Sequence, residues 1–113
     1  MRDEEAIRAL RTYPDVQAVR MERGQVLQYP GHYPLGVWVV LSGGLRLIPG
    51  QQVLDVDLCV LPPLCDLDRQ AAQGAVVERA ADALFVPHSV AREDEAVRRL
   101  LEQLAAPAVR EVR

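Results

Sequence analysis

The chain lacks lysine, so all 13 basic residues among its 113 are arginines. Sixteen acidic residues outnumber them, and the formal net charge is −3. A protein that binds nucleic acid normally carries a basic stripe that neutralises phosphates. Here Arg98-Arg99 is the only basic doublet. We therefore expect no direct DNA binding.

A long apolar run is also missing. Uninterrupted apolar stretches such as residues 37–41 fall far short of the roughly 20 residues that span a bilayer. The opening residues, MRDEE, are too acidic to begin a signal peptide. We expect a soluble, cytoplasmic protein without membrane insertion. At 113 residues, half of them hydrophobic, the chain predicts one domain with its own core.

Cysteine is scarce, and the motif C-x-x-C is absent. Cys59 and Cys65 are too few for a disulfide framework, and lone thiols typically behave as small buried hydrophobes. A structural zinc site needs four ligands, and His32 and His88 stand at spacings that match no zinc module. A cysteine-ligated iron–sulfur cluster generally needs four thiolates. We predict neither a metal nor a cofactor.

The sequence does contain a marked change of pattern along its length. Residues 3–12 predict a short helix with acidic residues in its first turn, ended by Pro14. Residues 16–87 consist of short β-type runs separated by glycine or proline every eight to twelve residues or so, which is typical of an antiparallel sandwich or barrel. The run at 37–41 does not alternate, which predicts a central strand covered on both faces. The predicted strands are 16–21, 25–29, 37–42, 45–48, 53–60, 75–79 and 83–86, with a break at Gly43-Gly44.

A helical pattern returns near the end of the chain. Apolar residues recur at steps of three and four and predict an amphipathic helix over residues 90–105, stopped by Pro107 and followed by a frayed tail at 108–113. This leucine face either covers the open end of the strand region or pairs two copies in a homodimer. Its residues are Val97, Leu100, Leu101 and Leu104.

The order of helix, strands and helix is accompanied by a specific pattern of residues. Arg23-Gly24, Pro30-Gly31 and the run GVWVVLSGGLRL at 36–47 resemble the front half of a cyclic-nucleotide-binding domain, and residues 75–87 resemble its closing strand pair. The resemblance implies a mainly β jelly roll, or double-stranded β-helix, with a helix at each end and spanning residues 1–113. Turning corners in such a roll requires positive φ or a close backbone approach, for which four glycines are suited: Gly24, Gly31, Gly36 and Gly43.

The resemblance also implies where a ligand would bind. In that family the phosphate lies in a cassette of Phe-Gly-Glu, a short helix and Arg-Ser/Thr-Ala. An ungapped register places Pro62-Pro63-Leu64 and Gln73-Gly74 at the two motifs. Leu64 cannot hold a ribose diol, and Gln73 carries no charge for a phosphate. We therefore predict that cyclic AMP and cyclic GMP are not usefully bound.

Arg69 could substitute for the missing arginine if the loop is shifted. Its alternative role is that of a solvated loop arginine beside Asp66 and Asp68. The family usually joins this domain to a DNA-reading module, a kinase or a channel, and no such module fits after the final helix. We therefore predict a stand-alone domain.

Aromatic residues are few, and three of the five lie within ten residues around His32. They suggest a ligand or partner patch, because tyrosine and tryptophan concentrate at binding hot spots. The alternative interpretation, which we favour, is that the cluster packs the first hairpin on the core. The patch consists of Tyr29, His32, Tyr33 and Trp38.

These observations predict a non-enzymatic regulatory or adaptor module that binds a protein partner or a small ligand other than a cyclic nucleotide. The first alternative is a cyclic-nucleotide sensor with a shifted cassette that uses Arg69. A second is a cupin-like metalloenzyme, although the His-x-His motif of cupin metal sites is absent. No catalytic residue is predicted, because neither G-x-S-x-G nor another nucleophile motif occurs.

Overall fold

The computed structural model describes the backbone of residues 2–111 and the side chains of residues 3–104. Within this range, no helix is long and apolar enough to cross a membrane. The elements follow one another as α1 (Arg2–Leu10), β1 (Gln17–Met21), β2 (Val26–Gln28), β3 (Gly36–Ile48), β4 (Val53–Val56), β5 (Cys59–Leu61), the 3₁₀ helix η1 (Leu64–Asp66), β6 (Gly74–Pro87), α2 (His88–Glu93) and α3 (Glu95–Glu111).

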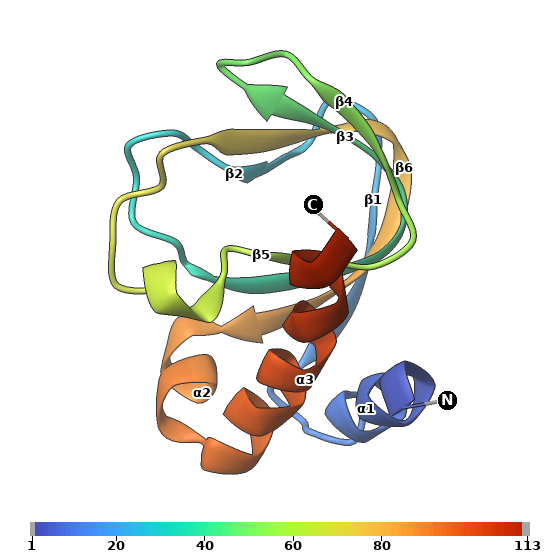
Figure 1. Cartoon of the computed structure of the whole chain (residues 1–113), viewed down its shortest axis with the longest axis vertical. Coiled ribbons are helices and arrows are strands. Elements are labelled where there is room, and N and C mark those ends of the chain that lie inside the picture. The colour runs from blue at the N-terminus through green and yellow to red at the C-terminus, as the bar shows by residue number, and fades with distance from the viewer. Residues whose placement is uncertain (1, 112–113) are drawn as a thin grey trace.

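One antiparallel sheet forms the body of the protein. Its two long strands, β3 and β6, pair with each other, and the short strands are added at their free sides. β1 and β2 pair with β6, whereas β4 and β5 pair with β3. The sheet curls into a roll, and α2 and α3 lie beside its lower end (Figure 1). The predicted mainly β roll with a helix at each end is confirmed.

The strand boundaries differ from the prediction at three places. The expected break at Gly43-Gly44 is wrong, because β3 continues through it, and β6 likewise joins two predicted strands. The register between β3 and β6 shifts around Gly43, which has a φ of +119°. Such a bulge bends a strand without ending it. The predicted strand 53–60 is instead two strands, β4 and β5.

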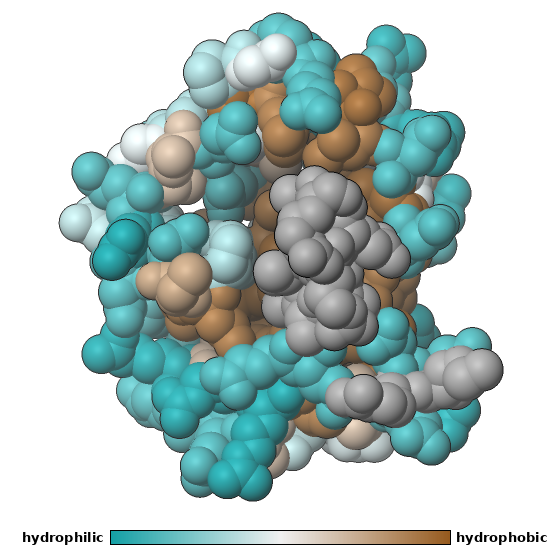
Figure 2. All heavy atoms as spheres, in the orientation of Figure 1, coloured by the Kyte–Doolittle hydropathy of each residue, from teal (hydrophilic) through white to brown (hydrophobic). Residues whose placement is uncertain are grey.

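Two clusters of buried hydrophobic side chains use opposite faces of the sheet. The helix-side cluster joins Val37 and Val39 to residues of α1, α2 and α3, and the roll cluster places Val40 and Leu45 inside the curled sheet. These side chains of β3 are fully buried, which confirms the central strand covered on both faces. Figure 2 shows hydrophilic atoms over the helices at the bottom of the view and hydrophobic atoms within the roll.

The predicted helix at 90–105 is two helices. α2 ends at Glu93 and α3 begins at Glu95, with Asp94 between them in an extended conformation. The Asp94 carboxylate accepts a hydrogen bond of 3.1 Å from the amide of Val97, which makes it the N-cap of α3. The predicted stop at Pro107 is also wrong, since α3 continues to Glu111. Proline inside a helix removes one backbone donor and crowds the preceding turn, but its fixed φ is helical, so a helix can continue through it at a cost in stability. The last residues of the predicted tail, 112–113, lie outside the described residues.

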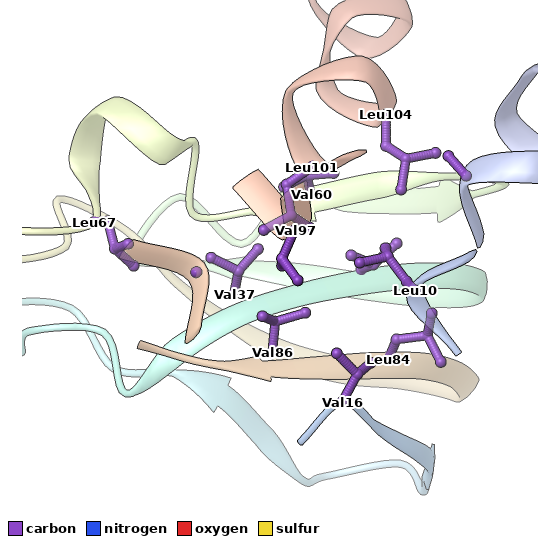
Figure 3. Close-up of a cluster of buried hydrophobic side chains, with 13 residues drawn as sticks. Leu10, Val16, Val37, Val60, Leu67, Leu84, Val86, Val97, Leu101 and Leu104 are labelled. Atoms are coloured by element: carbon purple, nitrogen blue, oxygen red, sulfur yellow. The ribbon is translucent and has the colours of Figure 1, made fainter. Parts of the chain in front are cut away.

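The leucine face of α3 covers the strands. Val97, Leu101 and Leu104 are fully buried and point towards β3, β5 and β6, beside Val37 and Val60 (Figure 3). Leu100 is partly buried against the same cluster. Three of the four residues are thus buried within the chain, as expected of a face that covers the strands. A homodimer stays a prediction.

We predict that Gly43→Ala lowers the free energy of unfolding by at least about 2 kcal/mol. An added Cβ would lie 2.7 Å from the Ala80 carbonyl oxygen, and φ at this position is +119°. Gly50→Ala is the matched control, because its nearest neighbour would be 4.0 Å away. Urea denaturation should show a change within about 0.5 kcal/mol for this control. Equal effects of the two substitutions would contradict the bulge.

Candidate functional site

A cavity of about 460 Å³ lies between the strands and the loop of residues 62–73. This loop carries η1 and joins β5 to β6, at the open side of the roll (Figure 1). We call it the loop cavity. Its walls come from the end of β5, the loop, the start of β6, and single residues of β2 and β3.

The loop cavity contains opposite charges and several neutral amides. Arg69 is the only cation among its lining residues, and Asp66 is the only anion. The Arg69 side chain is exposed, and within the described part of the chain its guanidinium has neither a hydrogen bond nor an ion pair. The amides belong to Gln28, Gln70 and Gln73. The polar groups of the cavity therefore carry no net formal charge.

Gly74 closes one corner of the cavity. A Cβ at this position would lie 2.6 Å from both the Gln28 carbonyl oxygen and the ring of Pro30. The side-chain nitrogen of Gln28 donates to the Gln73 carbonyl oxygen at 2.8 Å, which keeps β2 close to β6. A serine or threonine at residue 74 would therefore require β2 to move.

The predicted ligand residues do not all reach the cavity. Arg69, Gln73 and Gly74 line it, together with the Pro62-Pro63 pair. Leu64 is not among the lining residues, because its side chain packs against the helix-side cluster.

The sequence did not predict three of the polar residues that line the cavity: Gln28, Asp66 and Gln70. Gln28 lies 45 residues before the loop residue it contacts, so no local pattern marks it. Asp66 and Gln70 stand near Arg69 in the sequence, and their position in η1 and the loop brings them to the wall. A neutral amide in a loop gives no signal of its own in a single sequence.

Asp68 fastens the loop to α2. Its two carboxylate oxygens face different partners: the Nε2 atom of His88 at 3.1 Å and the guanidinium of Arg92. Desolvation alone would raise the pKa of the Asp68 carboxyl. The hydrogen bonds and positive charges of Arg92 and His88 outweigh it and hold the pKa below its ordinary value. Asp68 pairs with these two residues and not with Arg69, its neighbour in the sequence.

A second hollow, of about 340 Å³, lies between β2, the segment 29–36 and the end of β6. It contains all four residues of the predicted patch, Tyr29, His32, Tyr33 and Trp38, and also Phe85. We call it the aromatic groove. The rings of Trp38 and Phe85 are 4.7 Å apart between centroids, and those of Tyr29 and His32 are 5.4 Å apart. The cluster therefore combines core packing with an open surface.

The aromatic groove and the loop cavity share a wall. The amide of Gly31 donates to the Ala71 carbonyl oxygen at 2.7 Å, and the amide of Ala71 donates to the His32 carbonyl oxygen at 2.8 Å. Gln28 lines both hollows. A displacement of the cavity loop would therefore be transmitted directly to the groove.

The cysteines and histidines lie apart. Cys59 is partly buried on β5, and burial raises the pKa of its thiol, whereas Cys65 is exposed on η1. The expectation of a buried thiol is thus wrong for Cys65. His32 lies in the aromatic groove, and His88 begins α2. Among the residues with described side chains, no group of three His, Cys, Asp or Glu could hold a metal ion.

Comparison with known proteins identifies the fold. No model of a known protein family matches the chain, and no curated protein does. Solved structures do match. The Thermus thermophilus catabolite activator protein is 21% identical, with a TM-score of 0.58 over 96% of this chain and 55% of that one. A cyclic nucleotide-binding domain from Methylobacillus flagellatus KT is 17% identical, with a TM-score of 0.63 over 95% and 68%.

A third structure, from work on a cyclic-GMP-dependent signalling pathway that regulates bacterial phytopathogenesis, is 17% identical, with a TM-score of 0.64 over 96% of this chain and 92% of that one. The chain has the fold of a cyclic-nucleotide-binding domain. It spans 55% of the length of the Thermus protein. In this cyclic-nucleotide-binding fold, the loop between β5 and β6 is the segment that the sequence resemblance equates with the phosphate cassette. The loop cavity is lined by residues of this segment.

We predict that Arg92→Gln raises the pKa of Asp68 towards its ordinary value, because the substitution removes the stronger of its two partners. The folded state binds the Asp68 proton less tightly than the unfolded state. The stabilisation is therefore complete above the unfolded-state pKa and is lost as pH falls through the folded-state pKa.

Carboxyl-carbon NMR titration would measure this change. Arg99→Gln is the control, since it removes an arginine that pairs with Glu95 instead. An unchanged Asp68 titration in Arg92→Gln would contradict the contact.

Proposed function

We propose that the chain is a non-enzymatic regulatory or adaptor module, and that it acts through a protein partner or a small ligand other than a cyclic nucleotide. The observation that carries this proposal is the chemistry of the loop cavity. Gln73 and Gly74 line it at the place where the resemblance expects an arginine and a hydroxyl residue. In that register the arginine that would bind the phosphate is replaced by Gln73, and the one cation among the lining residues is Arg69.

The missing contacts are large enough to decide the affinity. A hydrogen bond to a charged group contributes roughly 1.5–3 kcal/mol, and every 1.4 kcal/mol or so changes a dissociation constant tenfold. Pro62-Pro63-Leu64 replaces the acidic motif, so the ribose contact is lost as well. Loss of both anchors moves a micromolar ligand towards millimolar affinity.

Arg69 supports a second candidate, a cyclic-nucleotide sensor with a shifted cassette. Its side chain lines the same cavity and is unpaired within the described residues. Asp66 lines the cavity too, however, and would repel a phosphate. The carboxylate is the reason for preferring the first candidate.

Isothermal titration calorimetry with cyclic AMP and cyclic GMP separates the two candidates. We expect no saturable heat from the unmodified chain at nucleotide concentrations up to about 1 mM. Gln73→Arg should bind at least about tenfold more tightly, because it adds a cation at the place where the resemblance expects an arginine. Gln17→Arg is the control, since it adds the same charge at an exposed position on β1.

Micromolar binding by the unmodified chain would contradict the proposal. If Arg69→Gln then abolished that binding, the sensor with the shifted cassette would replace it.

A further inference from the structure

We propose that the aromatic groove docks an extended, uncharged, proline-rich segment of a partner protein. The inference rests on the proposed function, because it names the kind of partner through which the module acts. Four features of the groove carry it: exposed apolar rings, an absence of formal charge, free hydrogen-bond donors and a fixed floor.

Large exposed hydrophobic side chains gather at this one place. Tyr29, Tyr33 and Leu35 are 57%, 63% and 85% exposed, and all three line the groove. Over the described surface, Val53 is the one other large hydrophobic residue that is comparably exposed. A concentration of exposed hydrophobic side chains at one groove is characteristic of an interaction site.

The lack of charged residues in the groove lining indicates what kind of segment would bind there. No aspartate, glutamate or arginine lines the groove, although 26% of the residues in the chain are charged. A charged segment would lose hydration there and meet no opposite charge. An uncharged segment has no such penalty, so the uncharged wall is matched by an uncharged partner.

The free polar groups of the groove suit a backbone that offers acceptors. Among the described residues, the hydroxyls of Tyr29 and Tyr33 have no hydrogen-bond partner, whereas the indole nitrogen of Trp38 already donates to the Leu27 carbonyl oxygen at 3.0 Å. A polyproline helix has no internal hydrogen bonds, and its prolines have no N–H. Its carbonyl oxygens can therefore accept from the tyrosine hydroxyls. Aromatic grooves are the usual receptors for such segments.

The floor of the groove is held in place before any partner binds. A Cβ on Gly36 would lie 2.3 Å from the Val86 carbonyl oxygen and 2.6 Å from the ring of Phe85, so the ring lies directly across the glycine. The amide of His88 donates to the Leu35 carbonyl oxygen at 3.0 Å, which fixes the far end of the segment. A preformed groove loses little entropy when a stiff polyproline helix binds.

The single tryptophan of the chain allows a direct test, because Trp38 lines the groove. Acetylated and amidated decaproline is titrated into the full chain while tryptophan fluorescence is recorded. We expect a saturable change with a dissociation constant on the order of 100 µM. An uncharged glycine–serine peptide of the same length should give no saturable change.

Variants of Tyr33 separate ring contact from hydrogen bonding. Tyr33→Ala should weaken decaproline binding at least about tenfold, and Tyr33→Phe about threefold, because phenylalanine keeps the ring and loses the hydroxyl. Val53→Ala is the matched control, since it truncates an exposed hydrophobic residue outside the groove and should leave binding unchanged. Tyr33 is mostly exposed, so its variants should retain the stability of the unmodified chain.

Three results would overturn the inference. They are no fluorescence change with millimolar decaproline, an equal response to the glycine–serine peptide, and a dimer in sedimentation that Tyr33→Ala dissociates. The last result would mean that a second copy occupies the groove. Failure of the proposed function would instead appear as micromolar nucleotide binding in calorimetry, so the two failures are distinguishable.

Discussion

The pairing of β3 with β6 is the interaction on which the rest of the structure depends. Every other strand of the sheet pairs with one of these two long strands. Side chains on the two faces of the pair contribute to the two hydrophobic clusters. The bulge at Gly43, packed against Ala80 and Ala81, lets the pair bend without separating. The bend closes the sheet into a roll, and the roll positions the start of β6 beside β2. Both the loop cavity and the aromatic groove exist because of that approach.

The distribution of charged residues explains why a chain with a cyclic-nucleotide-binding fold need not bind a cyclic nucleotide. Arg46 pairs with Glu78, Arg79 with Asp55, and Arg92 with Asp68, all away from the cavity wall. Exposed pairs of this kind contribute at most about 1 kcal/mol each. The Asp68 contact has a further consequence, because it ties the cavity loop to α2. The loop is thereby bonded to the helices on one side and, through Ala71, to the aromatic groove on the other.

Local patterns predicted what depends on neighbouring residues. Gly24, Gly31 and Gly43 have the expected positive φ, and Gly36 has the expected close contact with β6. The continuity of β3 through Gly43 is accompanied by close packing against Ala80 and Ala81, nearly forty residues later, so it left no local signal. Asp94 interrupts the helical region by capping α3, although periodicity alone continues through it. The gathering of the aromatic patch was suggested by proximity in sequence, whereas the place of Gln28 between two hollows required the fold.

The central claim is that the loop cavity of this cyclic-nucleotide-binding fold does not hold a cyclic nucleotide. The most direct measurement is a ¹H–¹⁵N NMR titration of the chain with cyclic AMP, which follows the amides of Gln73, Gly74 and Ala75 at the cavity wall. We expect these signals to stay in place at nucleotide concentrations of about 0.1 mM, well below the expected dissociation constant. Shifts that saturate at that concentration and are confined to the cavity wall would contradict it.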